Sequence, residues 1–569
     1  MIYRNNLRPA EATAGAAGGE KFASRRQNDV LMYNTGAGEA EDFNSFNSFS
    51  DEEEMPKRAP RRPASNNNNR QAGKKIPLIP VIAAVAAAVV LLIIIIACVA
   101  LSGGKNITYT DNTYVAFADG DGNYYVAANG TVLEESFEGE VEVIPSADKS
   151  FAYITDTTMD GINIYVLEGK KLTEVTTSPV VDVVAFATLE PGVIFNENNK
   201  YYLYSEATGE EMITRDHAQN IMISGDASTI VYTLDSDDGS GDTYLCVYTD
   251  GSPSKVEKNC TPVAVSNYGD YVYGIAKDSN GIDNLYVITT KDEESTVIEN
   301  STGILGITNM NVDGDEILFC SSNGTDCNTF IYNAKKNTTS SLAKYILSPV
   351  TTDPSIAIYD TFKDIYMAGY SLDGTKAITG YVDKDYGWNN IVRSVGKIDA
   401  EANYLYYVNE DLSLIQLDLN DKDNSKNRID DDVVDFTITE KGNVYSLNKD
   451  KQLRFYKAST DDKDRIADDV GAISIYSYAN EVYFSDAEAV DVSIYTSKEG
   501  SDKDMAKLDS TQITSVPTFS HTNSKKTYAY YYDIDYGWML FYTSNGKSFK
   551  LISDDCQALN GVDIPDMIG

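Results

Sequence analysis

A hairpin pattern that returns about every 40 residues constrains the fold of this 569-residue chain more than any other feature. From about residue 105 onward, an apolar, tyrosine-rich run is followed by a turn of Asp, Asn and Gly and then by a second such run. Examples are Phe151–Ile154 with Ile162–Val166, and Tyr528–Tyr532 with Met539–Tyr542. Apolar and polar residues alternate within the runs, which predicts β-hairpins. Several short strands per repeat are typical of the blades of a β-propeller, which bury their faces against one another.

The number of repeats favours an all-β protein with more than one propeller ring. About eleven blade-like units are recognisable, whereas a single ring has about 4–8 blades. We therefore expect two tandem rings, of about six units over residues 105–347 and about five over residues 356–569. The segment 347–355 contains two prolines and interrupts the period, so it is the expected boundary. The alternative is a long loop at this place within one irregular ring.

Three segments carry a resemblance to a known family of repeats. They are Ser146-Ala-Asp-Lys-Ser, Ser224-Gly-Asp-Ala-Ser and Ser371-Leu-Asp-Gly-Thr, each followed by a β-run. This arrangement resembles the Ser-x-Asp-Gly blade motif of TolB-type propellers. The repeats after Ala400 and the one near residue 190 lack the motif. The resemblance implies a propeller, and because this fold mostly serves binding, it implies little about chemistry.

The N-terminal part predicts a membrane anchor. Residues 76–101 are apolar and uncharged, and 20 or so such residues cross a bilayer as a helix. Residues 1–75 are polar and of low complexity, which predicts a disordered tail. Basic residues gather before the helix, and they place the N-terminus in the cytoplasm and the repeats outside the membrane. These residues are Lys57, Arg58, Arg61, Arg62, Arg70, Lys74 and Lys75.

An exterior location would permit disulfides among the five cysteines beyond the helix. In the segment around Cys320 and Cys327, Asn323-Gly324 is a strong signal for a two-residue hairpin turn, which would place the two cysteines opposite each other. We expect a disulfide there, and a second candidate pair is Cys246 with Cys260. The alternative is that all thiols are free.

The two tryptophans of the chain stand in matching hexapeptides, Asp-x-Asp-Tyr-Gly-Trp. Both hexapeptides fall at the turn of a predicted hairpin, so we expect them to project from the same kind of blade edge. Exposed aromatic rings beside carboxylates suit stacking on a sugar or anchoring a peptide. The alternative is packing against the next blade. The candidate ligand-binding residues are Asp385, Tyr386, Trp388, Asp535, Tyr536 and Trp538.

One further motif suggests a metal, and the rest of the chain argues against catalysis. Asp119, Asp121 and Asn123 alternate with glycines as in calcium loops, although an acidic hairpin turn explains them equally well. We expect no other cofactor. The chain has only two histidines and no Gly-x-Ser-x-Gly elbow, so no catalytic constellation is recognisable.

These features predict a single-pass, membrane-anchored binding or scaffolding protein for a protein or cell-envelope partner. A net charge of −39 argues against nucleic acid as that partner. The alternatives are an envelope enzyme that acts on carbohydrate with paired carboxylates, and a sensor that signals through the single helix.

Overall fold

The computed structural model describes residues 107–560 apart from short gaps at 177, 198–199, 215–216, 237–238, 250, 351–358, 422–424, 487–491, 509–510 and 534. The predicted tail (1–75) and membrane segment (76–101) lie outside the described residues. Within the described part, no helix is long and apolar enough to span a membrane. The one helical element described there is a 3₁₀ turn, η1 (Ser477–Ala479).

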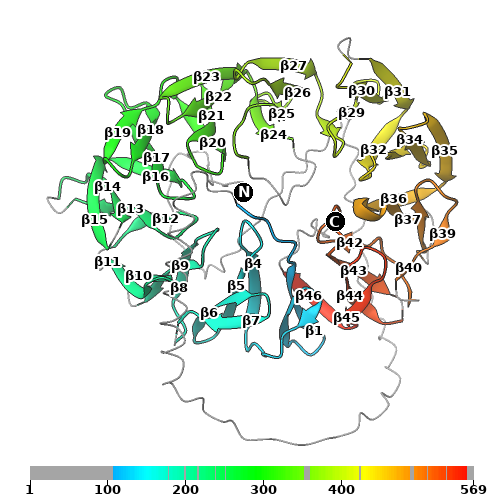
Figure 1. Ribbon diagram of the computed structural model, residues 1–569, viewed down its shortest axis with the longest axis horizontal. Coiled ribbons are helices and arrows are strands. Elements are labelled where there is room, and N and C mark those ends of the chain that lie inside the picture. The colour runs from blue at the N-terminus through cyan, green and yellow to red at the C-terminus, as the bar shows by residue number, and fades with distance from the viewer. Residues whose placement is uncertain are drawn as a thin grey trace, which may run out of the picture. The chain divides into compact units, whose positions relative to one another are not determined.

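Eleven four-stranded antiparallel sheets follow one another around a ring (Figure 1). We number these blades 1 to 11 and call their strands a to d from the centre outward. The first four blades contain these strands: blade 1, β46 (Cys556–Asn560), β1 (Tyr114–Asp119), β2 (Tyr124–Ala128) and β3 (Thr131–Val132); blade 2, β4 (Glu140–Pro145), β5 (Ala152–Thr158), β6 (Gly161–Glu168) and β7 (Lys171–Glu174); blade 3, β8 (Asp182–Phe186), β9 (Gly192–Glu197), β10 (Lys200–Ser205) and β11 (Gly209–Thr214); blade 4, β12 (Gln219–Ile223), β13 (Thr229–Asp235), β14 (Thr243–Thr249) and β15 (Ser252–Lys258).

The next four blades contain these strands: blade 5, β16 (Cys260–Val265), β17 (Tyr271–Lys277), β18 (Asp283–Thr289) and β19 (Glu294–Val297); blade 6, β20 (Ile304–Met310), β21 (Glu316–Ser322), β22 (Cys327–Asn333) and β23 (Thr338–Ala343); blade 7, β24 (Ile346–Pro349), β25 (Ile365–Tyr370), β26 (Ala377–Val382) and β27 (Trp388–Val392); blade 8, β28 (Gly396–Ile398), β29 (Tyr404–Val408), β30 (Leu414–Asp418) and β31 (Lys426–Asp430).

The last three blades contain these strands: blade 9, β32 (Val433–Ile438), β33 (Val444–Asn448), β34 (Leu453–Lys457) and β35 (Asp462–Ala467); blade 10, β36 (Val470–Tyr476), β37 (Glu481–Asp486), β38 (Ile494–Lys498) and β39 (Asp504–Met505); blade 11, β42 (Thr518–Phe519), β43 (Thr527–Asp533), β44 (Gly537–Thr543) and β45 (Lys550–Ser553). A small hairpin, β40 (Lys507–Leu508) with β41 (Thr511–Gln512), stands between blades 10 and 11.

The expected number of about eleven units is confirmed, but the expected division into two rings is wrong. All described residues fall in one compact unit. The C-terminal strand β46 pairs with β1, with Phe117 opposite Leu559, so the last strand completes the first blade and closes a single ring. The expected boundary at residues 347–355 begins inside β24, the innermost strand of blade 7. The period is interrupted there because the connection from β24 to β25 is long, and not because a second ring begins.

Strand direction gives the ring two different faces. Successive strands of a blade are antiparallel, so the a–b and c–d turns lie on one face and the b–c turns and d–a connections lie on the other. We call these the a–b face and the b–c face. The a–b turns at Ser146, Ser224 and Ser266 are alike, since each serine hydroxyl accepts the N–H of the residue five positions later. The same hydrogen bond occurs at Ser371, but there it belongs to a b–c turn.

Buried tyrosines of the b strands tie neighbouring blades together. The Tyr273 hydroxyl of β17 donates to the carbonyl of Gly314 in blade 6, at 2.7 Å. The Tyr406 hydroxyl of β29 donates to the carbonyl of Gly442 in blade 9, at 2.9 Å. Both glycines have left-handed backbones, with φ of 71° and 73°, which glycine adopts without a steric penalty. Across the closing seam, Tyr528 of blade 11 accepts the N–H of Gly130 in blade 1.

In each of these contacts the tyrosine ring is buried and its hydroxyl makes a hydrogen bond to the neighbouring blade. Burial raises the pKa of Tyr273 well above its ordinary value, so the hydroxyl stays protonated and keeps its role as a donor. The face of β17 that carries Tyr273 also packs in a hydrophobic cluster shared with the next blade. Tyr273, for example, packs with Ile317 and Phe319 of blade 6.

Prediction for Tyr273. We expect Tyr273→Phe to lower the free energy of unfolding by about 1–2 kcal/mol, because a buried carbonyl loses its donor. Denaturant unfolding followed by circular dichroism measures this change. Tyr271→Phe, two residues earlier in β17, is the matched control, because its hydroxyl has no hydrogen-bond partner among the described residues. It should change the free energy of unfolding by less than half as much. Equal losses of unfolding free energy in the two variants would contradict a stabilising role for the Tyr273–Gly314 hydrogen bond.

Candidate binding surface

The two Asp-x-Asp-Tyr-Gly-Trp hexapeptides lie on opposite faces of the ring. The first joins β26 to β27 and is a c–d turn, whereas the second joins β43 to β44 and is a b–c turn. The expectation that both project from the same kind of edge is therefore wrong. The reason is that Ile346–Pro349 takes the innermost place in blade 7, which moves every later strand of that blade outward by one position.

The first hexapeptide serves as a tie between blades 7 and 6. Tyr386 has a left-handed backbone with φ of 63°, and its hydroxyl donates to Glu316, a buried carboxylate on β21. Glu316 also accepts from Thr361 Oγ1 at 2.8 Å and from the Phe362 N–H at 3.0 Å. Burial, and then the Glu316 carboxylate, raise the pKa of Tyr386 to about 12. The ammonium of Lys363 lies 4.8 Å from the centre of the Tyr386 ring.

Of the two other predicted residues in this turn, Trp388 packs against its own blade and Asp385 is exposed. Trp388 covers Gly380 of β26, where a Cβ would meet the indole ring at 2.2 Å. Asp385 is exposed, and its N–H donates to Asp383. For Tyr386 and Trp388, the alternative of packing between and within blades fits this turn better than an open ligand site.

The second hexapeptide keeps its aromatic residues at the surface. Asp533 is buried, and its Oδ1 accepts the N–H groups of Asp535 at 2.9 Å and Tyr536 at 3.2 Å. The left-handed residue is here Gly537, with φ of 88°. As a result, Tyr536 is 59% exposed, and Asp535 is exposed beside it.

Trp538 and two tyrosines of β43 form an aromatic group behind this turn. The Trp538 ring stacks on Tyr530 with centroids 4.7 Å apart and an angle of 7°. Tyr532, which is 41% exposed, meets the same indole edge-on at 5.3 Å. The alternation along β43 places Tyr528, Tyr530 and Tyr532 on one side of the strand, toward blade 1. The run of tyrosines from 528 to 532 already contained this signal, but Tyr532 was not among the predicted site residues.

The predicted calcium loop lies on the same face of the neighbouring blade 1. Asp119 Oδ1 accepts the N–H groups of Asp121 and Asn123, and its Oδ2 accepts from Asn123 Nδ2 and the Tyr125 hydroxyl. These hydrogen bonds lower the pKa of Asp119. Across the described residues, no three acidic, histidine or cysteine side chains converge to hold a metal ion. In this structure the loop is an acidic hairpin turn whose carboxylate is occupied by the chain's own donors.

The expected opposition of Cys320 and Cys327 is wrong, because the turn between them has four residues instead of two. Asn323 Oδ1 accepts the N–H groups of Thr325 and Asp326, which draws both into the turn. Cys320 consequently faces Thr329, and Cys327 faces Ser322. The side chains of Cys246 and Cys260 lie in clusters on opposite sides of blade 4, so the second expected pair is also wrong. No disulfide joins any of the five described cysteines, and all five are buried.

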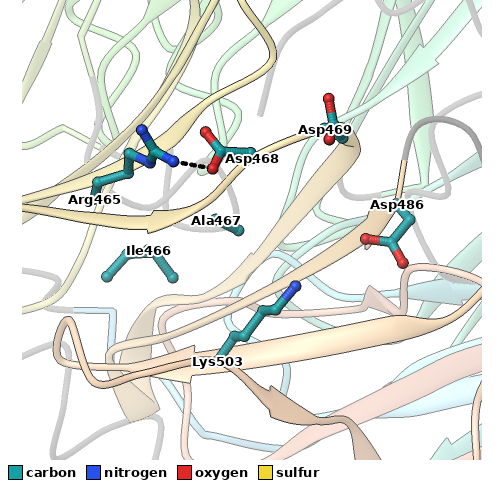
Figure 2. A pocket seen from close by; sticks show the side chains of 7 residues that line it. All are labelled: Arg465, Ile466, Ala467, Asp468, Asp469, Asp486 and Lys503. Carbon is teal, nitrogen blue, oxygen red and sulfur yellow. Dashed lines mark hydrogen bonds and ion pairs between the residues drawn. The ribbon is translucent and has the colours of Figure 1, made fainter.

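A polar cavity of about 560 Å³ opens between blades 9 and 10 (Figure 2). Arg465 pairs with Asp468 at its edge. Lys503 extends into the cavity toward Asp469 and Asp486, and its ammonium lies 4.5 Å from the centre of the Tyr495 ring. Five of the seven lining residues are charged and only Ile466 and Ala467 are apolar, so the cavity offers little apolar area to a ligand.

Exposed apolar side chains are distributed unequally between the two faces. Six of the twelve exposed large hydrophobic residues described lie in b–c turns or d–a connections: Met159, Val181, Ile282, Leu372, Val492 and Tyr536. A seventh, Tyr532, is the penultimate residue of β43, next to a b–c turn. Four others lie on outer strands: Met212, Val297, Met505 and Leu551. The twelfth, Val434, is on the innermost strand β32, and the described a–b and c–d turns carry none. Because the described turns of the other face carry no such residue, the b–c face is the candidate binding surface.

Aspartates accompany these apolar residues. Every b–c turn that the structure describes without a gap carries at least one, as follows: Asp121, Asp160, Asp278, Asp326, Asp373, Asp411 and Asp450. Sequence reasoning missed this ring of turns because the face to which a turn belongs depends on strand order within its blade.

The sequence matches no described protein family, and no curated protein is significantly similar to it. Among solved structures, the chain is similar to TolB from Acinetobacter baumannii at 11% identity and a TM-score of 0.25, covering 42% of this chain and 65% of that one. It is similar to a putative TolB from Agrobacterium tumefaciens at 13% identity and a TM-score of 0.24, covering 49% and 87% of the two chains.

The chain is also similar to the β-propeller domain of the Trilobed protease from Pyrococcus furiosus, at 12% identity and a TM-score of 0.21, covering 60% and 99%. The chain thus spans about two thirds of the length of the first TolB structure. At these identities and TM-scores we take neither fold nor function from the likeness, and the β-propeller rests on the strand pairing alone.

Prediction for the two hexapeptides. We expect Tyr386→Phe to lower the free energy of unfolding by about 1.5–3 kcal/mol, because the buried Glu316 carboxylate loses a donor. Tyr536→Phe, at the matching position of the exposed turn, should change it by less than about 0.5 kcal/mol. Chemical denaturation of the two variants beside the wild type measures both values. The assignment of the first turn as a tie fails if the two variants are equally stable.

Proposed function

We propose that this protein is a membrane-anchored binding or scaffolding module whose b–c face receives a protein partner outside the cytoplasm. The observation that carries the proposal is the gathering of exposed apolar side chains on that face, with none at the described turns of the other. Apolar and aromatic anchors surrounded by polar residues are what protein interfaces use for affinity.

The point at which the chain enters the ring lies on the face opposite the proposed binding surface. The Thr110 N–H donates to the carbonyl of Asp148 at 2.9 Å, and Thr110 Oγ1 donates to that of Lys149 at 2.5 Å. Both acceptors belong to an a–b turn, so the chain enters on the a–b face. The residues that precede Thr110, which include the proposed membrane segment at 76–101, are therefore joined to the ring on that face and not on the b–c face.

The charges of the exterior are consistent with a partner of opposite sign. Residues 1–75 hold 12 basic and 10 acidic residues and residues 76–101 hold no charge, so the residues from 102 onward carry a formal charge of −41, against −39 for the whole chain. A surface this acidic speeds the approach of a basic partner and repels nucleic acid and anionic lipid. We propose no catalytic role for it.

Prediction for partner capture. Full-length protein is cross-linked in its own membranes and purified, together with a triple variant of the b–c face, Met159→Ala/Leu372→Ala/Tyr536→Ala. We expect the wild type to capture a protein that this variant loses by about tenfold or more, because each truncated anchor costs roughly 1 kcal/mol.

The control for capture is a triple variant of exposed apolar residues on outer strands, Met212→Ala/Val297→Ala/Met505→Ala. It removes comparable side chains from the rim and should capture the partner as the wild type does. Equal capture by both triple variants and the wild type would exclude the b–c face as the binding surface.

A further inference from the structure

The chain contains one occupied and one open copy of the same hexapeptide, and the occupied copy indicates what the open one can bind. In the first copy, the Lys363 ammonium lies 4.8 Å from the centre of the Tyr386 ring, while Glu316 accepts from the Tyr386 hydroxyl. The tyrosine is thus enclosed by a cation on its ring and a carboxylate on its hydroxyl, both supplied by this chain.

In the second copy, the equivalent tyrosine faces solvent. The left-handed residue is Gly537 rather than the tyrosine, so Tyr536 points outward instead of toward the preceding blade. No lysine lies over its ring, and no hydrogen bond from its hydroxyl is recorded, among the residues that the structure describes. The Tyr536 side chain is 59% exposed.

An exposed carboxylate, that of Asp535, precedes this open tyrosine, and no basic residue belongs to its turn. The d–a connection that joins blade 11 to blade 1 contributes Asp554 and Asp555, and the Asp555 carboxylate lies against Gly120 in the b–c turn of blade 1. Among the described residues of the two b–c turns and of the connection between the blades, every charged side chain is therefore acidic.

From this comparison we propose that Tyr536, with Asp535, binds a lysine or arginine side chain of a polypeptide partner. The inference rests on the proposed binding function and gives its partner a chemistry. The cation lies over the phenol ring, and the Asp535 carboxylate neutralises it. The exposed Tyr532 ring near the end of β43 provides apolar area beside this turn for the stem of the side chain.

A cation fits this surface better than a sugar ring does. Sugars stack on broad aromatic faces, but one face of Trp538, the largest ring here, is already covered by Tyr530. Elsewhere the chain places its own lysines over tyrosine rings at 4.5–4.9 Å, as Lys255 does over Tyr244 and Lys503 over Tyr495. Lysine over tyrosine is therefore a pairing that this backbone accommodates repeatedly.

The test measures hexalysine binding to the full-length protein in a neutral detergent by isothermal titration calorimetry. Fully acetylated hexalysine, which has the same length without side-chain charge, and a neutral cello-oligosaccharide are the comparison probes. We expect Tyr536→Ala to weaken hexalysine binding about two- to fivefold and Asp535→Asn to weaken it about twofold. Asp385→Asn, the matching change in the occupied copy, should leave the affinity unchanged, and added salt should weaken binding to the wild type.

The inference is overturned if Tyr536→Ala binds hexalysine as tightly as the wild type, if acetylated hexalysine binds equally well, or if the oligosaccharide alone shows a dependence on Tyr536. These outcomes are separate from partner capture. If hexalysine binding does not depend on Tyr536 but partner capture depends on the b–c face, the cation site is excluded and the proposed binding function stands. If hexalysine binding depends on Tyr536 but partner capture does not depend on the b–c face, the cation site stands and the wider docking surface is excluded.

Discussion

The structure depends on the contact between neighbouring blades. A four-stranded sheet has two apolar faces, and in this ring each face is buried only by the blade beside it. The tyrosine ties show how the contact is made specific, since Tyr273 and Tyr406 each fill an interblade space and end on a glycine carbonyl of the next blade. The same arrangement must hold where the two ends of the chain meet. There β46 completes blade 1, and Tyr528 reaches across to Gly130.

The alternation of strands then determines where a binding surface can form. Each turn belongs to one face or the other according to its place within the blade, so a change of one strand position moves a motif across the molecule. The two hexapeptides demonstrate this effect. Near-identical residues form a buried tie at Tyr386 on one face and an exposed aromatic and acidic turn at Tyr536 on the other.

The sequence predicted the local structure well and the long-range arrangement less well. Hairpins, blades and their approximate number follow from alternation and from the repeat, which are local signals. The closure of one ring could not be predicted, because it depends on a pairing between residues near 117 and 559 that leaves no mark in either segment. The predicted register of Cys320 and Cys327 was wrong because one asparagine side chain lengthened the turn between them. The predicted face of Trp388 was wrong because Ile346–Pro349 resembles a linker in the sequence but forms a strand.

The most direct test of this account asks whether the chain forms one ring. Spin labels at Asp121→Cys with Asp535→Cys, and at Asp121→Cys with Asp326→Cys, report the distances from blade 1 to blades 11 and 6 in a chain with Cys98 replaced. The described native thiols are buried, and burial raises the pKa of Cys320 to about 11 and that of Cys260 to about 12, so they should not take up label. One ring predicts a distance on the order of 10–20 Å for the first pair, as for neighbouring sheets, and a much longer one for the second. The reverse result, with blade 1 beside blade 6, would contradict the single ring and the closing seam on which the proposed site depends.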